Sequence, residues 1–203
     1  MAVYLIRHTE FVVFDDQKRF SGQADPPLSS SGIEHAHRLA DRLRQVHFDS
    51  VHSSDLQRCL QTAEVIARAS GVPVRPDIRL REIDTGLWEG LTFEGAKTQY
   101  PFEYSERERD LVGYRFPGGE SFRDLHERVV PAFAQIVDEG GESILVVGHR
   151  GVNRVLLCDF LGLPLESLFS IEQDYGCVNL VRASRLPNGA RRFEVTAQPT
   201  LES

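Results

Sequence analysis

The sequence reads Ser143-Ile144-Leu145-Val146-Val147-Gly148-His149 at the point where its apolar residues are most concentrated. A short apolar run rich in β-branched residues is typical of a strand buried on both faces of a sheet. The N-terminus has a similar arrangement, because Val3-Tyr4-Leu5-Ile6 leads directly into Arg7-His8-Thr9-Glu10. We therefore expect two core strands, each ending at a histidine.

Helical periodicity separates the predicted strands. Apolar residues recur at three- and four-residue steps in four segments, and serines at 29–31 offer an N-cap for the first. Strands alternating with helices predict an α/β three-layer sandwich with a mostly parallel central sheet, in one domain over 1–203. The stretch 92–116 has no clean period and is predicted to be an insertion that caps the substrate. The expected helices cover 33–46, 55–71, 122–136 and 152–161, and the expected C-terminal hairpin joins 177–183 to 192–197 through Asn188-Gly189.

Composition narrows the function classes. The 203 residues include 30 Asp and Glu against 23 Lys and Arg, a net charge of −7, which argues against a general nucleic-acid binder. Positive charge for an anionic ligand must then be gathered locally. Three cysteines without a CxxC spacing favour a reducing compartment over a disulfide framework or zinc site. With no signal-peptide core and no apolar run near about 20 residues, we expect a cytoplasmic protein without a membrane span.

Two polar clusters follow the two most apolar strands, Arg7-His8-Thr9-Glu10 and Gly148-His149-Arg150. In open α/β sheets, ligands bind beyond the carboxyl ends of the strands. Histidines and arginines gathered there suit a phosphate group, because guanidinium groups grip its oxygens and imidazole attacks phosphorus or donates to oxygen. The sequence therefore predicts a compact cationic pocket at this sheet edge.

The chain resembles the histidine phosphatase superfamily, which has the phosphoglycerate-mutase-like fold, along essentially its whole length. A single Arg-His pair is a weak signal, but six blocks in the family's order are a strong one. The matching blocks are Leu5-Ile6-Arg7-His8-Thr9-Glu10, 22–29 with Gly32, 53–63, Leu80-Arg81-Glu82-Ile83-Asp84 with 86–90, 117–121 and Val147-Gly148-His149.

The resemblance implies a role for each residue of the pocket. His8 is the implied nucleophile, its other ring nitrogen donating to a backbone carbonyl. Arg7 and Arg58 are the implied phosphate clamps, and His149 is the implied second histidine, protonated among the phosphate oxygens. Glu82 is the implied general acid. No metal and no cofactor are required by this mechanism.

Composition alone does not choose Glu82 over the nearby carboxylates Asp84 and Glu89; the family pattern does. Thr9 and Gln23 are further candidates for hydrogen bonds to phosphate, and Arg150 for a charge at the pocket rim or a solvated position. The segment Phe11-Val12-Val13-Phe14 either packs on the core or walls the substrate side. Candidates for the leaving-group wall within 92–116 are Tyr100, Tyr104, Arg107, Arg109, Tyr114 and Arg115.

These features favour a phosphomonoesterase that hydrolyses a small phosphorylated metabolite through a phosphohistidine. The main alternative is a cofactor-dependent phosphoglycerate mutase, but the chain is short for that branch and has Glu82-Ile83-Asp84-Thr85-Gly86 in place of Glu-Arg-x-Tyr-Gly. A non-catalytic relative that binds phosphorylated ligands is a third, weaker hypothesis. Within the family the sequence looks similar to α-ribazole phosphatase and broad-specificity phosphatase members. The natural substrate and the oligomeric state stay open at this level, a homodimer being one option.

Overall fold

The computed structural model describes residues 1–13, 15, 17–185 and 191–197. Its strands form one mixed sheet in the order β3-β2-β4-β1-β5-β6. The first four strands pair in parallel where they adjoin, and β5 and β6 pair antiparallel to their neighbours. The strands are β1 (Ala2–Arg7), β2 (Ser50–Ser53), β3 (Val74–Pro76), β4 (Ser143–Gly148), β5 (Val178–Arg185) and β6 (Arg191–Ala197).

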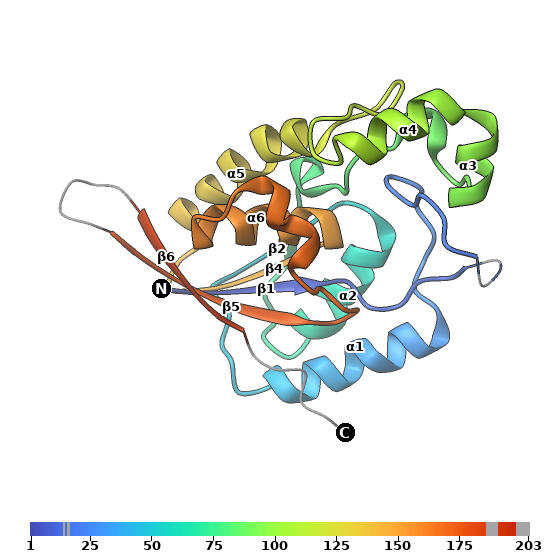
Figure 1. Ribbon diagram of the computed structural model, residues 1–203. Helices are drawn as coiled ribbons and strands as arrows, with labels where there is room; N and C mark the ends of the chain where they lie inside the picture. Colours follow the sequence, from blue (N-terminus) through green and yellow to red (C-terminus); the bar gives the residue numbers. More distant parts are fainter. Residues whose placement is uncertain (14, 16, 186–190, 198–203) are drawn as a thin grey trace.

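Helices cover both faces of the sheet, as Figure 1 shows. Alternate residues of β4 point to opposite faces: Ile144 and Val146 join the core beneath α5 and α6, whereas Leu145 and Val147 join the core beneath α1 and α2. The result is the predicted three-layer α/β sandwich. The helices are α1 (Ser30–Leu43), α2 (Gln57–Ala67), α3 (Phe93–Gln99), α4 (Pro101–Arg109), α5 (Phe122–Glu139) and α6 (Arg150–Leu161), with 3₁₀ turns at Ile78–Leu80, Gly86–Trp88 and Leu165–Ser170.

The predicted elements are confirmed apart from their boundaries. The Ser29 side chain caps α1 by accepting from the amide of Gly32. Helix α6 begins at Arg150 rather than near 152, since His149 is the extended residue that precedes it. Strand β3 was not predicted, because three edge residues carry too little pattern. The strands of the C-terminal hairpin pair as expected, but its predicted turn at Asn188-Gly189 lies outside the described residues.

The stretch 92–116 contains the helices α3 and α4, which sequence periodicity did not indicate. Only Ala96 is buried in α3, and α4 buries none of its residues, so neither helix carries an apolar stripe. Local signals begin them instead: Thr92 Oγ1 accepts from the amide of Gly95, and Pro101 occupies the first turn of α4. Both helices lie at one end of the molecule (Figure 1).

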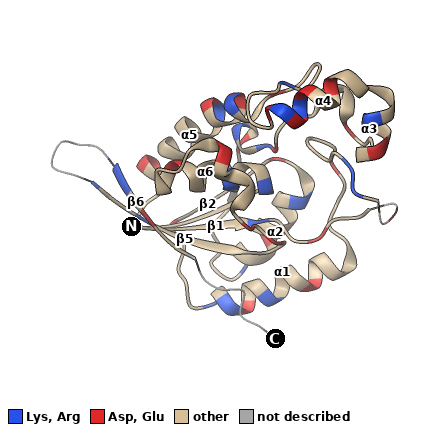
Figure 2. Ribbon diagram, viewed as in Figure 1, with Lys and Arg blue, Asp and Glu red and all other residues tan. Residues whose placement is uncertain are grey.

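Acidic and basic residues alternate along α1, α4 and α5 in Figure 2, so none of these helices carries one sign of charge. Within the described residues, no helix is both long enough and apolar enough to cross a membrane. Cys59, Cys158 and Cys177 are all free thiols.

Candidate active site

The sheet brings the two polar clusters together. Arg7, the last residue of β1, pairs with Gly148, the last residue of β4. The His8 amide then donates to the Gly148 carbonyl at 3.0 Å, which places the His8 and His149 rings 5.2 Å apart. Both histidines therefore lie at the carboxyl edge of the sheet, as expected from the sequence.

Both histidines open onto one large cleft with a volume of about 870 Å³, here called the main cleft. Six predicted site residues line it: Arg7, His8, Arg58, Glu82, His149 and Arg150. Its other lining residues are Phe11, Val12, Val13, Asp15, Gln17, Lys18, Arg19, Ser21, Ala24, Asp25, Pro26, Glu89, Gly90, Phe93 and Tyr175.

His8 is held in one orientation. Its Nδ1 lies 2.7 Å from the carbonyl oxygen of Thr9, so Nδ1 carries the proton and donates to that oxygen. The other nitrogen, Nε2, is then an unprotonated acceptor. Burial lowers the pKa of His8 well below its usual value, and the charges of Arg58 and Arg7 lower it further. The imidazole is therefore neutral, which is the state a nucleophile requires.

Arg58 and Arg7 present buried, incompletely paired guanidinium groups to the cleft. Arg58 is the second residue of α2; its Nη2 and Nη1 donate to the carbonyls of Gly22 at 2.8 Å and Ala24 at 2.5 Å. Arg7 Nη1 donates to Gln173 O at 2.7 Å, and its guanidinium lies 3.8 Å from the centre of the Tyr175 ring. Nε of both arginines is buried without a partner among the described residues. An anion that accepts from them would satisfy these donors.

His149 is fully buried behind His8. Its Nε2 lies 2.9 Å from Ser54 Oγ and 3.3 Å from Cys59 Sγ. Burial lowers its pKa well below the usual value, and the nearby Arg58 adds to this effect. Without an anion, the site thus favours the neutral ring, because it desolvates the imidazole and surrounds it with cations; a His149 protonated among phosphate oxygens stays a prediction.

The three candidate carboxylates occupy different positions. Glu82 lines the cleft, where its Oε2 accepts from the Gly151 amide at 2.9 Å and its Oε1 from its own neighbour Ile83 at 3.0 Å. Asp84 is bound within a turn, accepting from the Gly86 amide at 2.8 Å. Glu89 accepts from several donors of the 22–24 segment and from Thr85. Of the two candidate carboxylates that line the main cleft, Glu82 therefore has fewer hydrogen-bond donors than Glu89.

The remaining predicted residues are placed differently from one another. Arg150 is exposed and lines the main cleft beside the arginine pair. Thr9 does not line it: the side chain is fully buried, with its Oγ1 3.3 Å from Thr62 Oγ1. Gln23 does not line it either, since its Nε2 donates to the Glu82 carbonyl at 3.4 Å. For both, a contact with phosphate stays a prediction.

Aromatic and aliphatic residues that the sequence did not single out as ligands form the cleft wall. Phe11 and Tyr175 each lie 5.6 Å from the His8 ring, centre to centre. Val12 and Val13 follow Phe11 along the wall, which decides between the two positions considered for the 11–14 segment; Phe14 is outside the described residues. None of the six candidates named within 92–116 lines the cleft, whereas Phe93 does. The three tyrosines among them pack against Trp88 instead: Tyr100, Tyr104 and Tyr114.

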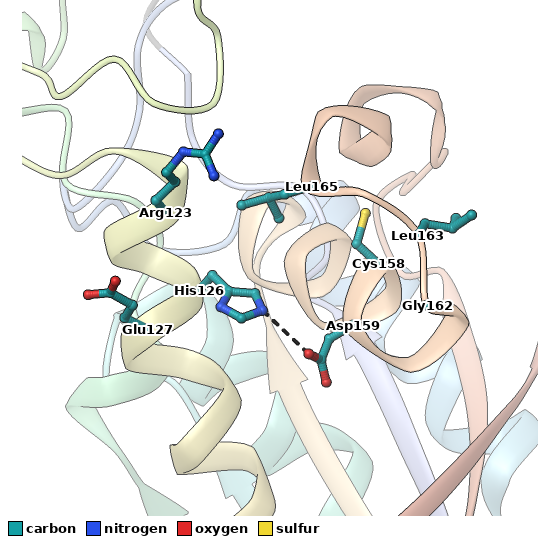
Figure 3. A pocket seen from close by; sticks show the side chains of 8 residues that line it. All are labelled: Arg123, His126, Glu127, Cys158, Asp159, Gly162, Leu163 and Leu165. Carbon is teal, nitrogen blue, oxygen red and sulfur yellow. Dashed lines mark hydrogen bonds and ion pairs between the residues drawn. The ribbon is translucent and has the colours of Figure 1, made fainter.

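A second depression of about 480 Å³ lies between α5 and α6 (Figure 3). His126 and Asp159 face each other across it with 3.4 Å between Nε2 and Oδ1, and Cys158 lies at its edge. None of the predicted site residues lines it. Among the described residues, no group of His, Cys, Asp and Glu side chains is arranged to hold a metal ion.

Comparison with known proteins identifies the family. The sequence profile of the histidine phosphatase superfamily (branch 1) matches residues 3–194. The chain belongs to this superfamily. The match runs from Val3 in β1 through the whole of β5 and includes all five cleft-lining residues whose roles the resemblance implied, so these residues belong to the matched family domain.

Similar proteins include both phosphatases and mutases. The 6-phosphofructo-2-kinase/fructose-2,6-bisphosphatase 1 of Mus musculus is 37% identical over 82% of this chain, which spans only about a third (34%) of that relative. The probable phosphoglycerate mutase GpmB of Salmonella typhi is 34% identical over 81% of this chain and 76% of its own. The crystal structure of the alpha-ribazole phosphatase from Shigella flexneri superposes with a TM-score of 0.86 at 29% identity, covering 98% of this chain and 96% of its own.

Proposed function

We propose that this histidine phosphatase superfamily member is a phosphomonoesterase acting on a small phosphorylated metabolite through a phosphohistidine. The observation that carries the proposal is the His8 tautomer. Because Nδ1 donates to the Thr9 carbonyl at 2.7 Å, the lone pair on Nε2 is free to form the bond to phosphorus.

In the first step, His8 Nε2 attacks phosphorus in line, the N–P bond forms and the bond to the ester oxygen breaks. Arg7 and Arg58 bind the equatorial oxygens through donors that include their unpartnered Nε groups. Glu82 gives its proton to the leaving alkoxide, so the alcohol departs neutral. His149, neutral in the free site, takes up a proton from solvent when the bound phosphate dianion offsets the surrounding cations, and the imidazolium donates a hydrogen bond to a phosphoryl oxygen; the proton returns to solvent when phosphate leaves.

In the second step, water attacks the phosphohistidine. The Glu82 carboxylate accepts the proton of that water, the N–P bond breaks, and inorganic phosphate leaves with His8 neutral again. The chain's own residues complete this cycle, and no metal or organic cofactor takes part. We also propose that Arg150 lies at the rim of the cleft, beside the substrate, and that Phe93 belongs to a cap formed by the 92–116 segment over the leaving group. Residues 1–203 would then form one domain that includes this cap. The free thiols fit a reducing, cytoplasmic setting.

The test is hydrolysis of p-nitrophenyl phosphate by the wild-type protein and by His8→Ala. We expect turnover in the wild type, acid-labile and alkali-stable phosphate labelling of the protein, and loss of both in His8→Ala. Comparable turnover in the variant would contradict a phosphohistidine mechanism. A protein that binds phosphate without any turnover would instead support the non-catalytic hypothesis.

A phosphoglycerate mutase is the second candidate, because of the similarity to the probable mutase of Salmonella typhi. A mutase must protect its phosphoenzyme from water and depends on bisphosphoglycerate for priming. Incubation with 3-phosphoglycerate separates the two: a phosphatase releases inorganic phosphate, and a mutase forms 2-phosphoglycerate when bisphosphoglycerate is added.

A further inference from the structure

We infer that Glu89 is a positioning residue for the phosphate clamp: it holds the 22–24 segment, whose carbonyls orient the guanidinium of Arg58. The inference rests on the proposed function only in taking Arg58 as a phosphate ligand. It assigns a task to a carboxylate that lines the main cleft but is not needed for proton transfer.

The Glu89 carboxylate gathers the amides of three successive residues. Its Oε1 accepts from Gly22 at 2.9 Å and from Ala24 at 3.2 Å. Its Oε2 accepts from Gln23 at 3.1 Å and from Thr85 Oγ1 at 2.7 Å. Charge-assisted bonds of this kind are stronger than neutral ones, so a single side chain fixes the path of the 22–24 segment.

The same segment offers its carbonyl oxygens to Arg58. Gly22 O and Ala24 O accept from Nη2 and Nη1 at 2.8 and 2.5 Å, one carbonyl for each arm of the guanidinium. Arg58 is almost fully buried, and no carboxylate contacts its guanidinium within the described residues. Its plane is therefore set by two carbonyls that depend on Glu89 for their own position.

The close packing of Gly22 shows how tightly this connection is built. A Cβ at position 22 would lie 2.2 Å from the Ile83 carbonyl oxygen and 2.9 Å from Glu89 Oε2. The nearer obstacle is a backbone carbonyl, which cannot turn away as a side chain can, so only glycine lets the 22–24 segment lie this close to Ile83 and to the Glu89 carboxylate.

Glu89 also carries a negative charge beside a site that binds anions. On electrostatics alone, removing that charge would strengthen binding of a phosphate dianion. If Glu89 instead positions Arg58, removing it weakens binding, because the guanidinium loses its fixed orientation. The two explanations therefore predict opposite signs for one measurement.

The experiment measures orthovanadate and inorganic phosphate binding by calorimetry in four proteins: wild type, Glu89→Gln, Arg58→Ala and the double variant. We expect Glu89→Gln to weaken binding by roughly 10- to 100-fold, the range of a charge-assisted hydrogen bond. In the Arg58→Ala background the same change should alter affinity by less than about 2-fold, since the residue it positions is gone. Glu94→Gln, an equal charge change at an exposed position on α3, should leave affinity unchanged.

Thr85→Val is the second variant, used because Glu89→Gln also loosens the loop and lowers stability. It removes one donor to Glu89 Oε2 while keeping every charge, and should weaken vanadate binding by a smaller factor with the same dependence on Arg58. Thermal denaturation of each variant verifies folding first. Equal or tighter binding in folded Glu89→Gln, or losses that simply multiply in the double variant, would overturn the inference.

Binding and turnover fail independently in this design. Coupled binding losses in a protein that lacks phosphatase activity would keep the inference and reject the proposed function. If the protein is an active phosphatase but the affinity losses of Glu89→Gln and Arg58→Ala multiply in the double variant, the proposed function is kept and the inference is rejected. A wild-type protein that binds neither anion would count against both.

Discussion

The Gly151 amide donates to Glu82 Oε2 at 2.9 Å, so the first turn of α6 holds a carboxylate that lines the main cleft together with the two histidines. Positive partial charge at a helix N-terminus favours a carboxylate at this position. The same helix begins immediately after His149. One element thus sets the relative positions of the second histidine and the proposed general acid.

Replacing Glu82 by Gln should slow hydrolysis in a way that depends on the leaving group. An amide cannot deliver a proton, so alkyl phosphates should lose roughly 10²–10⁴-fold in the rate of phosphoenzyme formation, the usual contribution of a general acid. p-Nitrophenolate leaves without such help and should lose far less. Rapid-quench comparison of the two substrates in both proteins is the measurement. Equal losses would mean that Glu82 shapes the cleft instead of donating the proton.

Gly151→Ala tests the same contact from the other side. A Cβ at position 151 would lie 2.4 Å from Glu82 Oε1, and this flexible carboxylate is free to swing away. We expect a small change in thermal stability but a clear loss of kcat for alkyl phosphates, in the direction of Glu82→Gln. The loss should nearly vanish in a Glu82→Gln background. A loss of equal size in both backgrounds would mean that Gly151 does not act on catalysis through Glu82.

The buried histidines should make the protein sensitive to mild acid. The pKa values of His8 and His149 are lowered by burial, so below about pH 6.5 the unfolded chain binds protons that the folded chain does not. The free energy of unfolding should then fall as the pH falls, by about 1.4 kcal/mol per pH unit for each histidine. The free energy of unfolding can be measured with urea at several pH values between 6.5 and 5. Its change per pH unit should be smaller in His8→Asn than in the wild type by about this amount. Identical slopes in the two proteins would contradict a depressed pKa for His8.

Catalysis should be independent of divalent metal ions. Arg7 and Arg58 supply the positive charge that Mg²⁺ or Zn²⁺ supplies in other phosphoryl-transfer sites. We expect full activity after dialysis against EDTA, and inhibition by vanadate, which mimics the five-coordinate phosphorus. Activity that is lost on chelation and restored by magnesium or zinc would refute this mechanism.

The sequence alone determined the layered fold and the edge at which the site lies. The apolar run 143–147 is typical of a strand inside a sheet covered on both faces, and parallel strands place their carboxyl ends at one edge. His8 and His149 follow two such strands and were therefore expected at that edge, whereas the pairing of β1 with β4, which brings the two rings together, is seen only in the structure. Helices that pack an apolar stripe on the sheet were predictable, because their apolar residues recur every three or four positions. Helix α4 buries none of its residues and was not predicted.

Only the tertiary structure shows what surrounds each of several chemically equivalent residues. Glu82, Asp84 and Glu89 look alike in the sequence, but their partners differ, and the decisive ones are Gly151 and the 22–24 segment, more than 60 positions away in the chain. Thr9, although adjacent to His8, turns its hydroxyl toward Thr62 instead of the cleft. Residue type and periodicity act locally, whereas the position of a buried polar group depends on which distant donors the packed chain brings to it.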